Sequence, residues 1–369
     1  MSTQNIYTVA LRGPSWVAIE KGDLLTIESK CSFGPLVMDF RTRYDEAYST
    51  PVPRELLVDV RGNAPSIREA IEAFWNAARG AAAPLALTAN AAVGELDFDV
   101  AYDATPDLAE RDFFQNFVAF ESGFPKRSRR IRSLYPASVY NAVEAHQDAD
   151  RIARAAEQYR HALLQWSRGR ETFSMSHLWM GVEALTPAVL HRYYRCQNLT
   201  RDTLIEAWRI ELKQLDSEVR RRLIFRMDDD AYKSAKTASD SFEHGFGDFQ
   251  QILQKAASAR NDTARYLRQA IFDLICLNED SSRILLEEPF AKPLDPASPA
   301  HYFKGVLIGL PDKLAAEGQA HPRMIWKGPV VKDISLDGGK YQVVVDNNMT
   351  ALLGPGVTLR PGKYEAWGP

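Results

Sequence analysis

Three side chains near residue 240 combine a proton-transfer group with a cation and a carboxylate. Lys236, Asp240 and His244 are spaced four residues apart, so a helix would place them along one face. Histidine, with an unperturbed pKa of about 6.5, moves protons near neutral pH. Asp240 would orient the imidazole or raise its pKa, and Lys236 would contact a phosphate, although an ammonium grips phosphate less firmly than a planar guanidinium. The spacing is compatible with phosphate chemistry.

The same residues have a structural alternative. His244 and Gly245 are also typical of a helix C-terminus. The imidazole would lie near the negative end of the helix dipole, and the glycine would follow the last helical residue. This alternative does not exclude a binding role.

Glu183 lies within the apolar stretch 178–185, which predicts a buried helix. A carboxylate on such a helix requires a partner. The candidate partners are Arg260, Arg265 and Arg268. The other interpretation places Glu183 beside His244 in a catalytic site. His177 lies off that face and is interpreted as a satisfied interior or boundary histidine.

Five cations stand within seven residues: Lys126, Arg127, Arg129, Arg130 and Arg132. Phe124 and Tyr135 flank them, and aromatic rings stack on bases while cations neutralise phosphates. The segment is therefore a candidate nucleic-acid-binding cluster. The formal net charge of −3 excludes a globally basic protein, so only a local patch could act in this way. The alternative is a solvated face or a set of interdomain ion pairs.

Sequence signatures of metal, nucleotide and disulfide chemistry are missing. The seven histidines show no HxxxH or HExxH spacing, the three cysteines are widely separated, and neither GxGxxG nor GxxxxGK[ST] occurs. We therefore expect no metal, no cofactor and no disulfide framework. The sequence has no signal-peptide pattern and no run of about 18 apolar residues, which predicts a cytoplasmic protein without a membrane partner.

Hydrophobic periodicity indicates an α+β fold in three parts. The chain has 369 residues, 45% of them apolar, and domains of roughly 100–200 residues predict two or three units. Residues 1–140 alternate as strands do and form a mixed α+β domain. A helix begins after Ser66 with Glu69 as its capping box. Pro84 predicts its end, and residues 108–121 predict a second short helix.

Residues 141–283 change to a helical period and predict a five-helix or four-plus-one bundle. Helices are expected at 149–168, 174–194, 201–215, 231–244 and 248–277. The second is apolar on nearly all sides and should form the buried centre, with Pro187 kinking or ending its first part. Residues 284–369 begin with a proline-rich linker and continue as a small β-rich unit, in which Asp337-Gly338-Gly339 predicts a hairpin turn.

Two segments of the predicted bundle resemble Apea-like HEPN domains. Residues 157–186, which contain LWMGVEAL, are similar to the opening helix pair of that family. Residues 231–245, which end in His244-Gly245, and the following LRQAI resemble its later pair. The resemblance covers roughly residues 145–280. It implies a helical bundle, commonly dimeric, and a metal-independent ribonuclease whose arginine and histidine face the RNA backbone.

The chain departs from the family motif RSxIVHG, because Ser239, Ala238 and Thr237 stand where the arginine would be. We therefore expect a non-catalytic or weakly catalytic HEPN-like protein. It would bind RNA or a protein partner, form a homodimer through its bundle, and act in the bacterial defence or toxin–antitoxin setting that the resemblance implies. One alternative is an active endoribonuclease that uses His244 with Lys236 or Arg260. The other is a structural homodimeric interaction protein.

Overall fold

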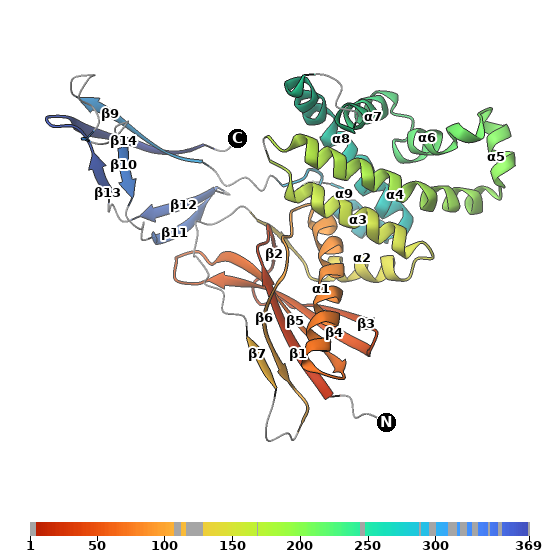
Figure 1. Cartoon of the computed structure of the whole chain (residues 1–369), viewed down its shortest axis with the longest axis horizontal. Helices are drawn as coiled ribbons and strands as arrows, with labels where there is room; N and C mark the ends of the chain where they lie inside the picture. Colours follow the sequence, from red (N-terminus) through yellow and green to blue (C-terminus); the bar gives the residue numbers. More distant parts are fainter. Residues whose placement is uncertain are drawn as a thin grey trace. The chain divides into compact units, whose positions relative to one another are not determined.

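The computed structural model of the chain describes residues 5–106, 112–115, 128–167, 169–243, 248–287, 289–294, 300–308, 316–317, 323–326, 331–338, 340–345 and 349–367. The chain divides into two compact units, Met1–Arg43 with Arg54–Pro296 and Tyr44–Pro53 with Ala297–Pro369. The predicted α+β class is confirmed: a sheet, a set of helices and further strands follow one another along the chain (Figure 1).

Six described strands of the first unit form one sheet in the order β3-β4-β5-β1-β6-β7. They are β1 (Asn5–Gly13), β3 (Leu25–Cys31), β4 (Gly34–Asp45), β5 (Val52–Ala64), β6 (Asp97–Asp103) and β7 (Phe113–Gln115). Alternate side chains of β1 are buried at Tyr7, Val9 and Leu11, as the period of two predicts. The helix predicted over 108–121 is wrong at 113–115, where the backbone pairs with β6 as strand β7.

Helix α1 (Ile67–Ala89) begins after Ser66, as predicted, with Ser66 as its N-cap and the Glu69 carboxylate bonded to the Ser66 hydroxyl. The Ser66 hydroxyl oxygen accepts from the Glu69 N–H at 3.4 Å, and the hydroxyl donates to Glu69 Oε2 at 2.7 Å. The end predicted near Pro84 is wrong, because the helix continues to Ala89. Residues 81–89 are all buried. Their packing therefore offsets the roughly 3 kcal/mol that an interior proline costs a helix.

The buried end of α1 receives two arginines from distant segments. Its last carbonyls have no partner within the helix and need donors from elsewhere. Arg268 donates to Leu87 O at 2.7 Å and Thr88 O at 3.0 Å. Arg129 donates to the carbonyls of residues 89 and 90 at 3.3 and 3.1 Å. Arg129 belongs to strand β8 (Arg129–Ile131), which pairs in parallel with β2 (Val17–Ile19).

Arg268 is only 2% exposed. Burial lowers its pKa to about 10, which leaves the guanidinium charged at neutral pH. The carbonyl end of the helix dipole stabilises that charge. Asn90 ends α1 in the left-handed conformation, with a φ of 49°. The Tyr159 hydroxyl donates to Asn90 Oδ1 at 2.7 Å and ties a third segment to this point.

The remaining helices of the first unit, in its described part, come after strands β6, β7 and β8. They are α2 (Leu134–Glu144), α3 (Ala149–Leu164), α4 (Glu171–Gln197), α5 (Arg201–Trp208), η1 (Leu212–Gln214), α6 (Leu215–Val219), η2 (Arg220–Ile224), α7 (Asp229–Glu243), α8 (Phe249–Ile275) and α9 (Glu279–Leu286). Helices α3, α7 and α8 occupy the predicted ranges to within a few residues.

Two helices differ from expectation. Helix α4 continues past Pro187, and it is not buried on all sides, since Phe173 and Met180 are exposed. The helix predicted over 201–215 ends at Trp208, because Arg209 takes a left-handed φ of 54°. Contacts with α3 and α8 bury only part of the α4 surface.

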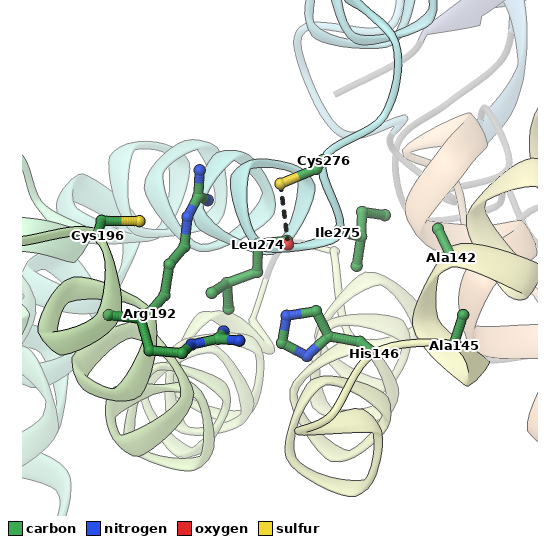
Figure 2. Close-up of a pocket in the computed structure, with 9 residues that line it drawn as sticks. Ala142, Ala145, His146, Arg192, Cys196, Leu274, Ile275 and Cys276 are labelled. Atoms are coloured by element: carbon green, nitrogen blue, oxygen red, sulfur yellow. Dashed lines mark hydrogen bonds between the residues drawn. The ribbon is translucent and has the colours of Figure 1, made fainter.

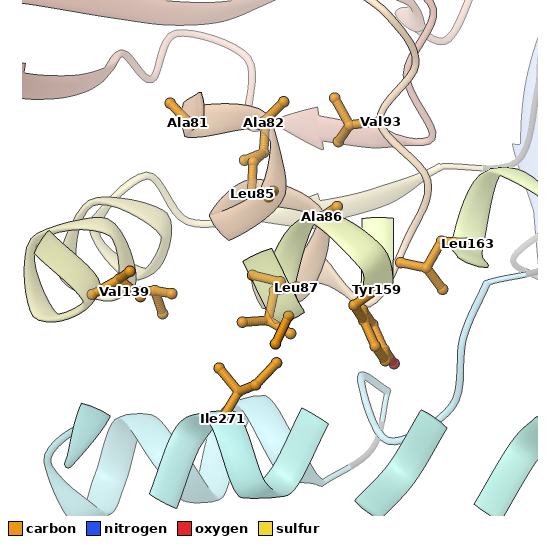
Figure 3. Packing of buried hydrophobic residues seen from close by; sticks show 14 of the residues in the cluster. Ala81, Ala82, Leu85, Ala86, Leu87, Val93, Val139, Tyr159, Leu163 and Ile271 are labelled. Atoms are coloured by element: carbon orange, nitrogen blue, oxygen red, sulfur yellow. The ribbon is translucent and has the colours of Figure 1, made fainter. Parts of the chain in front are cut away.

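One hydrophobic cluster joins the sheet and the helices of the first unit. Figure 3 shows Leu85 and Ala86 of α1 packed among Val139 of α2, Leu163 of α3 and Ile271 of α8. The boundary predicted at residue 140 lies inside α2, so the first two predicted parts share a core and one compact unit.

The second unit is built from strands. They are β9 (Ala300–Ile308), β10 (Arg323–Trp326), β11 (Val331–Asp337), β12 (Lys340–Val345), β13 (Met349–Leu352) and β14 (Thr358–Trp367). Asp337 pairs with Lys340 across the predicted hairpin turn. The connection between β4 and β5 is part of the second unit. Its Ser49 hydroxyl donates to Asp333 Oδ1 at 2.6 Å, and its Thr50 N–H donates to Ile334 O at 2.9 Å.

Replacing Arg268 with methionine should lower the free energy of unfolding by roughly 2–4 kcal/mol, because buried carbonyls would lose their donors. Urea unfolding followed by tryptophan fluorescence measures the change. Arg265→Met, on the half-exposed side of the same helix, is the control and should cost less than about 1 kcal/mol. Equal losses in both variants would contradict the role assigned to Arg268.

Candidate functional site

Helix α7 carries two of the three predicted chemical groups. Lys236 and Asp240 are exposed one turn apart, while Ala235 and Ala238 are buried. His244 lies outside the described residues. Ser239, one of the positions where the resembled family has arginine, is only 3% exposed. A side chain at that position faces the packed interior and not a ligand.

Glu183 is paired, but with an arginine that was not expected. Its Oε1 lies 3.1 Å from Arg220 Nη1, and the carboxylate is 45% exposed, so it is not the buried group that the apolar sequence predicted. The Arg220 guanidinium also lies over the Trp179 ring, and its Nε donates to Thr186 Oγ1 at 3.2 Å. The expected partners have other contacts: Arg260, Arg265 and Arg268. Glu183 therefore links α4 to η2 through its ion pair with Arg220, and among the described side chains it does not pair with Lys236.

The predicted basic cluster is not a uniform surface. Arg129 points its guanidinium into the fold at the end of α1. Arg130 and Arg132 are exposed on either side of buried Ile131. Lys126 and Arg127 lie outside the described residues. Of the cluster, the structure presents Arg130 and Arg132 as accessible cations.

A cavity of about 580 Å³ lies among the last turn of α2, the C-terminal part of α4 and the end of α8. Figure 2 shows His146 and Arg192 entering it from different elements, beside Leu274 and Ile275. Arg195 also lines it. Two free cysteines border it: Cys196 and Cys276. The volume is within the range of about 300–1,000 Å³ typical of small-molecule sites.

The two arginines of this cavity stand one turn apart on α4. Arg192 donates to the backbone carbonyl of Asp273, and Arg195 Nη1 donates to Gln147 Oε1 at 2.8 Å. Within the described chain neither guanidinium forms an ion pair, and the Asp273 carboxylate is already paired with Arg226 at 2.5 Å. Since each guanidinium has five N–H donors, most remain available for an oxyanion such as phosphate.

His146 presents a donor to the same cavity. Its Nδ1 accepts from the Asp148 N–H at 3.0 Å. Burial lowers the pKa of His146, and Arg195 and Arg192 lower it further, against the opposing effect of Asp148. The ring is therefore neutral near pH 7 and carries its proton on Nε2. It can donate to a ligand oxygen there, but it has no free lone pair with which to remove a proton.

A second polar cluster joins α3 to α4. The rings of His161 and His177 are stacked, with centroids 5.3 Å apart and planes 25° from parallel. Glu157 Oε1 lies 3.1 Å from His161 Nε2 and 2.7 Å from Arg160 Nη2. Although burial raises the pKa of Glu157, these bonds lower it to about 2. His177 is bonded to Gln158 Oε1 at 2.8 Å, as expected of a boundary histidine.

Sequence reasoning found neither the cavity nor the histidine pair. The three-residue spacing of Arg192 and Arg195 is visible in HRYYRC at the end of α4. The spacing becomes informative only when His146, from the turn after α2, and Leu274, from α8, lie beside these arginines.

Among the described side chains, no group of three or more histidines, cysteines, aspartates or glutamates is placed to hold a metal ion. None of the described helices has both the length and the apolar character needed to cross a membrane.

Comparison of the chain with protein-family models, with curated proteins and with solved structures found no match. The resemblance to Apea-like HEPN domains therefore stays an expectation that rests on the quoted sequence segments.

The free energy of unfolding should fall as the pH drops below about 6.5, the pKa of histidine in the unfolded chain. Burial, and then the charge of His161, lower the pKa of His177 in the folded protein. The unfolded state therefore binds the proton first, and stability present above pH 6.5 is lost on acidification. Urea midpoints at pH 7.5 and 5.5 should differ less in His177→Gln than in the parent protein. An unchanged difference would contradict this assignment.

Proposed function

We propose that the helical bundle binds RNA at the cavity among α2, α4 and α8, with no cleavage or only weak cleavage of the strand. The observation that carries this proposal is the pair Arg192 and Arg195, which is directed at an apolar cavity and forms no ion pair in the described structure. Guanidinium groups would contact a phosphate, while Leu274 and Ile275 would contact a base or ribose.

The state of His146 supports binding over chemistry. A general base for RNA cleavage needs an unprotonated ring nitrogen that faces the ribose hydroxyl. The Nδ1 atom of His146 already accepts a backbone N–H, so the ring offers the Nε2 proton to a ligand. The cavity therefore has donors for a phosphate and lacks a histidine base.

The sequence resemblance supports RNA as the ligand class, since α4 and α8, which supply most of the cavity lining, lie in roughly residues 145–280. A cytoplasmic location and a bacterial defence or toxin–antitoxin setting belong to the same proposal. Exposed Lys236, Arg130 and Arg132 would add phosphate contacts along a longer strand.

The double variant Arg192→Ala/Arg195→Ala should weaken the binding of a single-stranded RNA by about ten-fold or more, because two phosphate contacts are lost. The salt dependence should also fall, by about 0.7 in slope for each contact. Fluorescence anisotropy across a salt series measures both. Arg170→Ala, about 33 Å away at the other end of α4, is the matched control and should bind normally. Normal binding by the double variant would refute the site.

The same RNA incubated in chelator should stay intact, because the proposed site has no base for the ribose hydroxyl. Sequencing of RNA ends measures this. Cuts made by the parent protein and not by His244→Ala would favour the alternative, a metal-independent endoribonuclease that uses His244.

We further propose that the bundle forms a homodimer. Exposed apolar side chains gather on α4 and α7, where Phe173 is 53%, Met180 42% and Phe242 41% exposed. The rings of Phe173 and Phe242 meet edge to face at 6.4 Å, so the two helices present a joint apolar surface. Partners commonly cover such surfaces.

Light scattering should give twice the chain mass for the parent protein and the single mass for Met180→Lys, because a lysine would place a charge in the interface. Leu212→Lys, at a leucine of η1 that is 58% exposed, is the control and should remain dimeric. A single mass for the parent protein at high concentration would refute the dimer.

A further inference from the structure

A second hollow, of about 440 Å³, lies between the last turn of α2 and the six-stranded sheet. It lies against β3, an edge strand of the six-stranded sheet. Ala145 borders both this hollow and the arginine-lined cavity. An extended ligand that passes Ala145 can therefore reach both. We call the second hollow the α2–β3 subsite.

The polar lining of the α2–β3 subsite differs from that of the arginine-lined cavity. It has the carboxylates of Glu28 and Glu144, one ammonium from Lys30, and the amide of Asn141. A phosphate would meet two like charges here, which disfavours it. A neutral group that donates hydrogen bonds would instead find acceptors.

Two of these side chains are available to a ligand. Glu144 and Asn141 are exposed, and neither makes a side-chain hydrogen bond or ion pair with any residue that the structure describes. Tyr140, by contrast, lines the hollow with its hydroxyl already hydrogen-bonded. Its hydroxyl lies 2.6 Å from Ser29 Oγ, and burial raises its pKa, so it stays neutral.

We propose that the α2–β3 subsite binds a guanine base of the nucleotide adjoining the phosphate held by Arg192 and Arg195. This inference rests on the proposed RNA binding and adds a base preference to it. RNA-binding proteins commonly read single-stranded bases at their Watson–Crick edge. Guanine presents two neighbouring donors there, N1–H and the 2-amino group.

One carboxylate can accept both of those donors in parallel, as it does with the two N–H groups of a guanidinium. Glu144 supplies that carboxylate, and the Asn141 amide can donate to guanine O6. Adenine has an acceptor at N1 and uracil has a single donor at N3, so neither offers the paired donors. The subsite therefore discriminates by hydrogen bonding and not by charge.

Anisotropy with six-nucleotide RNAs tests the preference. Oligouridine is compared with versions that carry one guanosine, inosine or adenosine at each position in turn. The best-placed guanosine should tighten binding about ten-fold over adenosine, as expected for a bidentate contact. Inosine, which lacks the 2-amino group, should lose most of that gain.

Glu144→Gln should remove the guanosine preference and leave oligouridine binding unchanged. Glu72 is an exposed glutamate on a different helix, α1. Glu72→Gln is therefore the matched control and should keep the guanosine preference. Equal binding of guanosine and adenosine RNAs by the parent protein, or a preference that survives in Glu144→Gln, would overturn the subsite.

Arg192→Ala/Arg195→Ala separates the two proposals, since it should weaken binding of every oligonucleotide alike. If the double variant weakens binding but the parent protein shows no base preference, only the α2–β3 subsite is refuted. If the parent protein binds no RNA, both the RNA-binding site and the subsite are refuted.

Discussion

The buried carbonyl end of α1 is the constraint on which the first unit depends. A helix leaves its last carbonyls unpaired, and a buried carbonyl without a donor is costly. Arg268 from α8 and Arg129 from β8 meet these carbonyls, and Tyr159 from α3 meets Asn90 beside them. Each segment must dock at this point for the bonds to form. Arg268 belongs to the LRQAI segment on which the family resemblance partly rests, yet its contacts here are structural.

Close packing of α4 against its neighbours determines where the polar groups of the bundle emerge. A Cβ added at Gly181 would lie 2.7 Å from a Leu267 methyl group and 3.4 Å from the Ala155 carbonyl oxygen, so the glycine permits this approach. Polar clusters then lie at both ends of the α3–α4 pair, with His161 and His177 at one end. At the other end, the Asp148 carboxylate accepts from His191 at 2.9 Å.

The proposed function assigns the main phosphate contacts to α4, and Lys236 of α7 would add only a further contact on a longer strand. In the resembled family, arginine and histidine act together near the end of one helix, whereas here Ser239 is buried at one of the arginine positions. Arg192 and Arg195 provide the planar donors that Lys236 lacks. His146 adds a donor and no base. This combination would allow the proposed binding without cleavage through ordinary hydrogen-bond chemistry.

By itself the sequence determined the α+β class, the start of α1 at Ser66 and the ranges of α3, α7 and α8, because capping and periodicity act within a few residues. It did not determine that α1 passes Pro84, since burial against α2, α3 and α8 offsets the local cost of proline. The candidate site was equally hidden. Arg192, His146 and Leu274 are separated by at least 46 residues in the chain and meet only through helix packing. Proximity between distant segments depends on the whole core, so only the tertiary structure decided it.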